Sequence, residues 1–437
     1  MLFALALIQL TGQVRDEAVI GWLRKHAVPI KTVQPGNGFE DLQQVGKSLR
    51  GVRLVGMGEP THGTREACLF KHRMFEYLAE RQGYRVFGME ASFPDCLPIE
   101  KYIQTGEGDP EAVVHRQGFW TWDTEEVLGL VQWMRSYNLS HTERVHFVGF
   151  DTQAEGPAYA RVIDFLKAWR SSNLANLPMT NPTGKDLTLA LSILDENRRE
   201  LTRKSGTEAF AIARQCAAVA IQAFKAEQFN SDDIFKALMK TLARSQEDVD
   251  ALRKAGWVSK PVDEVLKGVN DSVVGHVVVR SVLERIQAEP GTLAKGTESH
   301  FQDLKVDLND LAKQLETIEA AVGWRDKCMA DNTAWIVGTL YPRAKTMLWA
   351  HNYHIGSSVP QDNASETMGR HLTTRFGKAY FPIGFSFGDG SFQSRLMSPT
   401  DPIGPLQEFQ VGPPSKGSLD EVLGKAGSLF MAKSFTQ

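Results

Sequence analysis

Four short apolar stretches of this 437-residue chain each end on an ionisable side chain. The stretches run from 52 to 58, from 84 to 89, from 145 to 150 and from 346 to 350. The residues that follow them are Glu59 with His62, Glu90, Asp151 and His351. Such short apolar runs are typical of strands in a buried parallel sheet. Because open parallel sheets bind ligands beyond the carboxyl ends of their strands, these four endings should meet at one site.

The segments between the strands repeat apolar residues at helical spacing, for example from 64 to 81 and from 125 to 137. Strands that alternate with helices indicate an α/β fold with a mainly parallel β-sheet core flanked by helices. Between 157 and 322 the strand pattern nearly vanishes, and Ala, Leu, Lys, Glu and Gln are abundant. This composition predicts an inserted all-helical subdomain.

The chain is longer than the size at which a single hydrophobic core stops growing, so we expect more than one part. Residues 1–40 are expected to form an N-terminal segment with a lead-in helix. Residues 41–156 and 323–437 should form the α/β catalytic core, and residues 157–322 a helical insertion that acts as a lid. The tail after Asp401 is rich in Pro and Gly and is predicted to be loop, with a short helix near 419–425.

The stretch from Met1 to Gln13 is mostly apolar but lacks the preceding positive charges of a complete secretory signal. It is either the remnant of a truncated signal peptide or a segment packed on the domain. We therefore expect a cytoplasmic protein, with a periplasmic or secreted location as the alternative. No later stretch has the roughly 18 uninterrupted apolar residues of a spanning helix, so we expect no membrane partner.

The formal net charge is -3, with acidic and basic residues mixed along the chain and no basic run. A nucleic-acid partner is therefore not expected, because such proteins carry a basic patch. The four cysteines are too far apart for a C-x-x-C zinc or redox motif, and we expect buried free thiols: Cys68, Cys96, Cys216 and Cys328.

The turn after the first strand carries His62 between glycines. A histidine has an ordinary pKa of about 6.5 and can take a proton from water if a carboxylate orients it. Glu59 lies on the same turn, and Glu90 ends the strand that we expect to be adjacent. His351 is predicted to hydrogen-bond the substrate carbonyl or to protonate the leaving group. These residues predict hydrolysis by a positioned water.

A metal site is the first alternative, because Glu59-x-x-His62 has the residue types of a carboxylate-bridged metal centre. Glu90, His351 and His354 would complete such a site. In the di-iron proteins the Glu-x-x-His pair lies along a helix, whereas Pro60 and glycines place it in a turn here. We therefore expect no metal and no other cofactor, with a metal-dependent hydrolase of another ester or lactone as the alternative.

A ligand-binding protein is the second alternative, suggested by a distant fold relative that holds haem. His72, His351 or His354 would then be an axial ligand, although the chain has no C-x-x-C-H motif. The aromatic loop around Trp120 has two interpretations as well. Its tryptophans either pack the loop or stack against a substrate.

Several motifs occur in the same order as in a known family. They are Gly58–Glu66, Lys71–Arg73, Glu90, Gly149–Gln153, Arg325–Asp326, Met329–Asn332, Trp349–His354 and the stretch from Met368 to Gly384. In these motifs, which span nearly the whole chain after residue 40, the chain resembles the erythromycin esterases. That group also includes proteins labelled as succinoglycan biosynthesis proteins, and only those labels suggest a role in surface-polysaccharide metabolism.

The resemblance implies a parallel-sheet core with a helical insertion and a cleft between them. It also implies a hydrolase that opens a macrolide lactone by adding water, without a serine acyl-enzyme or a metal, and so inactivates an antibiotic. His62 is then the general base, and Glu59, Glu90 and His351 are its supporting and electrophilic partners. The candidate substrate contacts are Arg65, Lys71, Trp120, Asp151, Arg325 and His354. Expected partners are water and a macrolide or another lactone or ester.

Overall fold

The computed structural model describes residues 16–170, 172–228, 320, 322–357, 366–395, 404–414, 418–427 and 429–432. The chain divides into two compact units. The first contains Met1–Ala226, Gly323–Ser394 and Glu408–Gln437, and it holds the sheet and the site described below. The second contains Glu227–Val322 and Arg395–Gln407, most of which lies outside the described residues.

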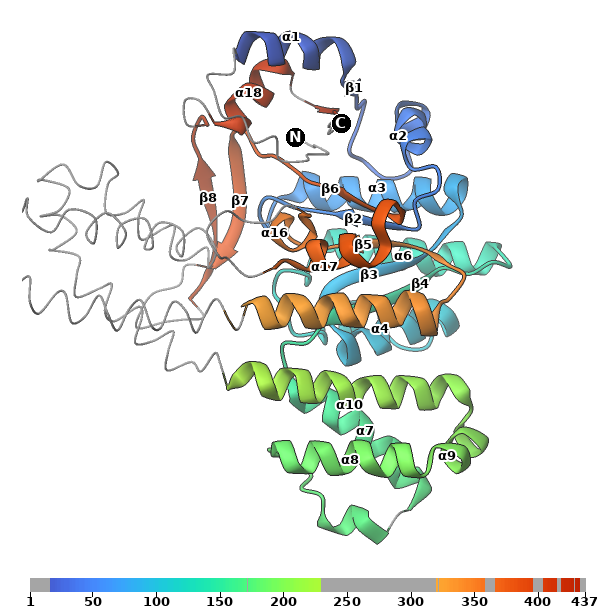
Figure 1. Cartoon of the computed structure of the whole chain (residues 1–437). Helices are drawn as coiled ribbons and strands as arrows, with labels where there is room; N and C mark the ends of the chain where they lie inside the picture. The colour runs from blue at the N-terminus through green and yellow to red at the C-terminus, as the bar shows by residue number, and fades with distance from the viewer. Residues whose placement is uncertain are drawn as a thin grey trace, which may run out of the picture. The chain divides into compact units, whose positions relative to one another are not determined.

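Five parallel strands form the central sheet (Figure 1). They are β2 (Leu54–Met57), β3 (Tyr84–Ser92), β4 (His146–Asp151), β5 (Lys345–Trp349) and β6 (Tyr380–Ile383). Their order across the sheet is β4-β3-β5-β2-β6, which confirms the predicted parallel α/β core. The expected adjacency of the first two strands is wrong, because β5 lies between β2 and β3. The carboxyl ends of these three strands therefore stand side by side.

Helices precede and follow most of the strands. Before β4 they are α1 (Asp16–His26), η1 (Glu40–Leu42), α2 (Gln43–Ser48), α3 (Arg65–Gln82), α4 (Phe93–Thr105), α5 (Pro110–His115) and α6 (Glu125–Ser140). After β4 come α7 (Glu155–Trp169), η2 (Ser172–Asn176), α8 (Gly184–Glu196), α9 (Arg198–Ser205) and α10 (Thr207–Glu227). A helix over 322–335 continues into the π-helical turn η3 (Ile336–Leu340), followed by α16 (Asn352–Ile355), α17 (Met368–Phe376), η4 (Gly377–Ala379) and α18 (Leu419–Ala426).

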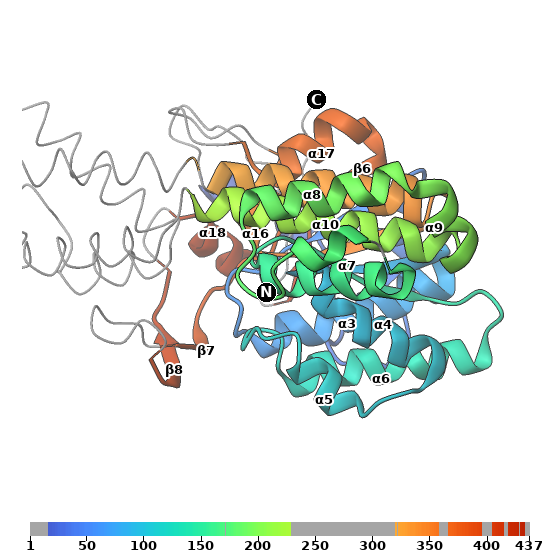
Figure 2. The ribbon, with the colours of Figure 1, turned by 90° about the horizontal axis from the view of Figure 1, so that it is seen from below.

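Successive side chains of the strands point to opposite faces of the sheet, and each face has its own hydrophobic core. Val55 and Met347 pack with α2, α3, α5 and α6 on one face. Leu54 and Leu348 pack with α7, α8, α10 and α17 on the other. Figures 1 and 2 show α7, α8 and α10 lying together along this second side. Coverage of both faces explains why the strands are apolar almost throughout rather than alternating.

Helices α7 to α10 belong to the same compact unit as the sheet. Gln215 of α10 donates a 2.6 Å hydrogen bond to Asn332, whose amide donates to the carbonyl of Phe150 at 3.0 Å. These bonds join α10 through the helix of residues 322–335 to the end of β4. Most of the rest of the expected insertion at 157–322, from 229 to 319, lies outside the described residues, so the role of the insertion as a lid stays a prediction.

Two two-stranded pairs complete the described strands. β1 (Val28–Pro29) pairs with β9 (Phe430–Met431), and β7 (Gly390–Arg395) pairs with β8 (Leu406–Val411). The prediction that the tail after Asp401 is loop apart from one short helix is therefore wrong. The partner of β9 is distant in sequence, and β8 is mostly exposed, so local patterning does not reveal these two strands.

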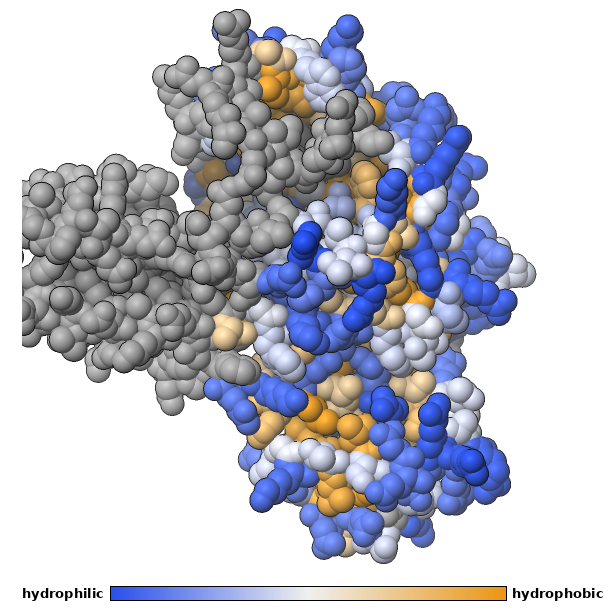
Figure 3. Space-filling view, viewed as in Figure 1, coloured by the Kyte–Doolittle hydropathy of each residue, from blue (hydrophilic) through white to orange (hydrophobic). Residues whose placement is uncertain are grey.

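The described surface seen in Figure 3 is mostly hydrophilic, with small hydrophobic patches over α8 and α10. Leu189 of α8 is an exposed large apolar side chain. None of the described helices combines the length and the apolar character that crossing a membrane requires.

Candidate active site

The turn between β2 and α3 carries Glu59 and His62 and is held tightly from two sides. A Cβ added at Gly58 would lie 2.1 Å from the side-chain oxygen of Asn352 in α16. A Cβ added at Gly63 would lie 1.8 Å from a backbone oxygen of β7. Only glycine fits such close approaches. The two glycines therefore fix where the catalytic candidates of this turn stand.

Glu59 is completely buried and accepts three hydrogen bonds. Its Oε1 lies 2.5 Å from Nδ1 of His62. Its Oε2 accepts from Nζ of Lys71 and from Nε1 of Trp349, both at 2.6 Å. Burial by itself raises the pKa of Glu59, but the charge of Lys71 and the bond from His62 lower it to about 2. Glu59 is therefore a carboxylate at neutral pH.

The side chain of His62 is 35% exposed, in contrast to that of Glu59. Because Nδ1 faces a carboxylate, the neutral ring carries its proton there and leaves Nε2 as an acceptor. Burial lowers the pKa of His62, but the bond and charge of Glu59, helped by the charge of Glu90, raise it above the ordinary value. A base in this position can take a proton from water.

An irregularity at the end of β3 orients the side chain of Glu90. The register with β4 shifts between Met89 and Ser92, so Glu90 sits in a bulge, and bulges redirect side chains. A Cβ added at Gly149 of β4 would lie 2.5 Å from the carbonyl oxygen of Ala91. The glycine thus leaves the room that the bulge needs.

The carboxylate of Glu90 joins three elements. Its Oε2 accepts the backbone N–H of His351 at 2.8 Å, just after β5. Its Oε1 lies 2.8 Å from Nη2 of Arg325 and 3.2 Å from Nε2 of His354. Burial raises the pKa of Glu90, but the charge and bond of His354 and the charge of Arg325 hold it well below its ordinary value. Glu90 is therefore a fixed negative charge.

His354 is a buried imidazolium between two carboxylates. Its Nδ1 lies 2.9 and 3.0 Å from the two oxygens of Asp326. Burial lowers the pKa of His354, but the charges of Asp326 and Glu90 outweigh it and raise the pKa to about 10. Since both ring nitrogens then donate, the 3.2 Å approach of Arg325 to Nε2 is a contact between two donors.

Arg325 donates two hydrogen bonds to Asp151 from neighbouring nitrogens of its guanidinium, with Nε 3.0 Å from Oδ1 and Nη2 2.7 Å from Oδ2. Such a two-point pair fixes the plane of the guanidinium. The arginine side chain remains 24% exposed, whereas that of Asp151 is fully buried. Arg325 is thus the part of this ion pair that a ligand can reach.

His351 faces His62, and the centroids of the two rings are 5.4 Å apart. Its Nδ1 accepts the backbone N–H of Tyr353 at 3.3 Å and caps α16, which places the proton of the neutral ring on Nε2. Burial and the charge of His62 lower the pKa of His351, so the ring is neutral at neutral pH. The 3.4 Å distance from Nε2 to the carbonyl of Pro60 is long for a hydrogen bond. This N–H remains available to a substrate.

Trp122 packs against the cluster from the loop before α6. Its Nε1 donates to the carbonyl of Glu90 at 2.9 Å, and its ring lies edge-on to His62, with centroids 5.5 Å apart. Trp120, the candidate that we named in this loop, is half-buried, and its substrate contact stays a prediction.

The structure brings most of the predicted residues into one cluster: Glu59, His62, Lys71, Glu90, Asp151, Arg325, His351 and His354. Two of the predicted substrate contacts need correction, because the side chains of Lys71 and Asp151 are fully buried behind their partners. We assign them supporting roles instead. Arg65 is 67% exposed and pairs with Glu126 of α6 at 2.8 Å, and its substrate contact stays a prediction.

Sequence reasoning did not assign site roles to Trp349, Asp326 and Asn352. Trp349 and Asp326 each lie within two residues of a predicted site residue, which was the available clue. Asn352 donates its backbone N–H to the carbonyl of Glu59 at 3.0 Å, and its side chain bonds both backbone groups of Phe385. It therefore ties the Glu59 turn to the segment after β6.

The alternatives for metal and haem concern the same histidines and carboxylates. No group of three or more His, Cys, Asp or Glu side chains among them is arranged to hold a metal ion. The oxygens of Glu59 and Glu90 accept from N–H groups instead. His72, the further haem candidate, is buried in α3 against Trp133, where burial lowers its pKa to about 4.

A parallel sheet with paired histidines and carboxylates at its carboxyl edge defines an α/β protein with a site suited to acid–base chemistry. The family described as erythromycin esterase matches residues 79–436. The chain therefore belongs to the erythromycin esterase family, and the family resemblance seen in the motifs is confirmed.

Two curated relatives cover the region before residue 79 as well. The Bacillus subtilis (strain 168) protein YbfO, whose name proposes a hydrolase, is 23% identical over 412 residues, which are 93% of this chain and 78% of that protein. Erythromycin esterase type II of Escherichia coli is 21% identical over 413 residues, covering 93% of this chain and 86% of that protein. The family and these names indicate a hydrolase of the esterase kind.

Two solved structures share the fold. A protein from Bacillus cereus has a TM-score of 0.64 at 21% identity, covering 94% of this chain and 84% of its own. A succinoglycan biosynthesis protein has a TM-score of 0.61 at 20% identity, covering 95% of this chain and 85% of its own.

Proposed function

We propose that the protein hydrolyses a lactone, with His62 as the base that activates water and a macrolide as the substrate class. One observation carries the proposal. His62 is bonded through Nδ1 to a buried carboxylate, is exposed in part, and faces the neutral donor His351. A histidine oriented by a buried carboxylate is a common general base.

In the proposed reaction, Nε2 of His62 takes a proton from water while the water oxygen attacks the carbonyl carbon of the ester. The Nε2–H of His351 donates to the carbonyl oxygen, where negative charge develops. The tetrahedral intermediate then collapses, and its bond to the alkoxyl oxygen breaks. His62 returns its proton to that oxygen, leaving an acid and an alcohol, which remain in one opened chain when the substrate is a lactone.

The surrounding charges favour the protonated state of His62 during attack. The cluster holds four carboxylates, from Glu59, Glu90, Asp151 and Asp326, against the cations of Lys71, Arg325 and His354. Protonation of His62 brings these charges into balance. Because they are held by the fold before water attacks, little reorganisation is needed in the reaction.

The macrolide assignment is supported by family membership and by the name of the Escherichia coli relative. The fold itself does not specify what fills the pocket. The partly exposed Arg325 is the proposed contact for a polar group of the substrate. Inactivation of the antibiotic would follow from opening its ring.

The test is incubation of the purified protein with macrolides of different ring size, followed by mass spectrometry with and without a chelator. A product heavier by one water, formed equally with the chelator, is the expected result. Loss of that product on chelation would contradict the metal-free mechanism. The absence of hydrolysis with macrolides, simple lactones and esters alike would overturn the proposal.

A further inference from the structure

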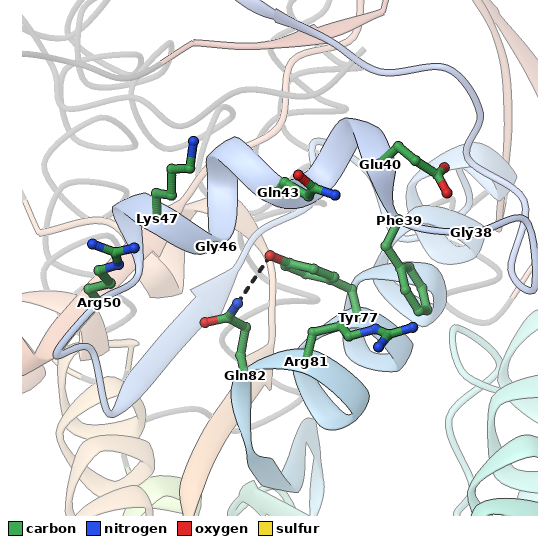
Figure 4. A pocket seen from close by; sticks show the side chains of 10 residues that line it. All are labelled: Gly38, Phe39, Glu40, Gln43, Gly46, Lys47, Arg50, Tyr77, Arg81 and Gln82. Carbon is green, nitrogen blue, oxygen red and sulfur yellow. Dashed lines mark hydrogen bonds between the residues drawn. The ribbon is translucent and has the colours of Figure 1, made fainter.

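A hollow of about 480 Å³ lies beside α2 and the far end of α3 (Figure 4). Its cationic side chains, Lys47, Arg50 and Arg81, point apart, and the ring of Tyr77 in its wall is only 3% exposed. These groups do not converge on a ligand. The buried ring of Trp122, by contrast, meets several groups of the candidate active site at once.

The turn that joins α5 to α6 holds Trp122 in place. The backbone N–H groups of Trp122 and Asp123 both donate to the carbonyl of Phe119, at 3.1 and 3.2 Å. Thr124 then caps α6, and its side chain accepts the N–H of Val127 at 3.3 Å. The turn is therefore closed by its own hydrogen bonds, and the indole that it carries is only 1% exposed.

The indole N–H of Trp122 supports the bulge that carries Glu90. A bulge leaves backbone groups outside the ladder, and a buried carbonyl without a partner is unfavourable. Nε1 of Trp122 donates to the carbonyl of Glu90 at 2.9 Å. The same indole lies nearly perpendicular to the ring of Trp349, with centroids 5.5 Å apart, and Trp349 donates to Glu59. Trp122 therefore contacts the strand end that carries Glu90 and the tryptophan that holds Glu59.

The ring of His62 needs a restraint besides its bond to Glu59. Its side chain is 35% exposed, and rotation of an imidazole about its last side-chain bond is only weakly restricted. Turning the ring over would replace Nδ1 by a carbon at Glu59 and would move Nε2. The rings of His62 and Trp122 have centroids 5.5 Å apart and are inclined by 86°. In such a perpendicular contact the edge of one ring meets the face of the other, which favours one orientation of the imidazole.

We propose that Trp122 is a positioning residue for the reaction at His62. It holds the imidazole in the orientation that points Nδ1 at Glu59 and leaves Nε2 to take a proton from water. The kinetic consequence of this role rests on the proposed function. The orientation of the ring is a property of the protein without substrate, so it can be measured separately.

Three variants test the proposal. Trp122→Met fills much of the space without a ring, and Trp122→Phe keeps a ring but loses the bond to the carbonyl of Glu90. Trp133→Met is the matched control, because Trp133 packs in the same hydrophobic core, against Phe75 at a centroid distance of 5.8 Å. Melting temperatures show which variants fold, and Trp122→Leu replaces Trp122→Met if the methionine variant does not.

The first measurement is the tautomer of His62, read by NMR of the imidazole nitrogens at alkaline pH, where the ring is neutral. The His62→Gln protein assigns the signals. The unaltered protein, Trp122→Phe and Trp133→Met should carry the proton on Nδ1, whereas Trp122→Met should show a mixture of both tautomers.

The second measurement is the rate of ester or lactone hydrolysis. Trp122→Met should lower kcat by about 100-fold while KM changes by less than about threefold, since a misplaced base affects the reacting state rather than binding. Trp122→Phe should lower kcat by less than about tenfold, the effect of one lost hydrogen bond. Trp133→Met should melt at a lower temperature and keep the kcat of the unaltered protein.

The proposal is overturned by an unchanged tautomer in Trp122→Met, by a kcat in that variant no lower than in Trp133→Met, or by a Trp122→Phe protein as impaired as Trp122→Met. If the unaltered protein hydrolyses no ester or lactone, the proposed function fails instead. The tautomer of His62 then still decides whether Trp122 positions its ring.

Discussion

The substitution Glu59→Gln separates the catalytic part of this site from its structural part. The carboxylate of Glu59 accepts hydrogen bonds from His62, Lys71 and Trp349 at 2.5, 2.6 and 2.6 Å and has no exposed surface. Glutamine keeps the volume but loses the charge, and its amide N–H₂ cannot accept hydrogen bonds. His62 would then lose the carboxylate that sets its tautomer and stabilises its protonated form.

The substitution is expected to lower both the rate of hydrolysis and the stability of the fold. Hydrolysis should fall by about 10²- to 10⁴-fold, the range associated with general-base catalysis. Stability should fall by about 3–5 kcal/mol, because the ammonium of Lys71 is left buried without its partner. No exposed surface of either side chain relieves this cost, since both are fully buried.

The double variant Glu59→Gln, Lys71→Met distinguishes the two losses. Methionine fills the space of the lysine stem without a charge, so most of the lost stability should return, to within about 2 kcal/mol of the unaltered protein. Chemical denaturation measures the stability, and the rate of ester or lactone hydrolysis measures the activity. Recovery of activity together with stability would refute the assignment of Glu59 as the partner of the base.

Three further results are expected. The acid limb of kcat/KM should have its midpoint above pH 6.5, because Glu59 raises the pKa of His62 and the base must be unprotonated; a midpoint below 6.5 would contradict this. The charge of His354, whose pKa is about 10, stabilises the fold below about pH 6.5 and progressively less as pH rises toward 10. His354→Gln should therefore lose less stability between pH 7 and pH 10 than the unaltered protein does. Gly63→Ala should lower the free energy of unfolding by about 1–3 kcal/mol, whereas Gly156→Ala, with open space around it, should not lower it; equal effects would refute the close approach.

Local sequence patterns predict most of the sheet and the ionisable side chains that gather at its carboxyl edge. Four of the five strands are short apolar runs followed by a charged or histidine side chain, as at Glu90 and His351. The order of strands was beyond local patterning, because nothing in the first two strands shows that β5 inserts between them. Pairing with a distant segment likewise hid β9, and the exposure of β8 left it without an apolar pattern.

The roles inside the cluster required geometry. Lys71 and Arg325 are both cations in family motifs, yet the first is buried behind Glu59 and the second stays partly exposed. A sequence motif does not show which of the two side chains is buried, because burial depends on which helix face meets the sheet. The proton positions of His351 and His354 follow from the groups next to each Nδ1, a backbone N–H and a carboxylate respectively.

The central claim is that His62 activates the water that breaks the ester bond. The most direct test compares kcat/KM for macrolide hydrolysis in the unaltered protein, in His62→Ala and in His115→Ala. His115 is an exposed histidine paired with Asp123, and it controls for the loss of an imidazole elsewhere. The account predicts loss of at least about 10³-fold in His62→Ala and no change in His115→Ala. Activity retained in a folded His62→Ala protein would contradict it.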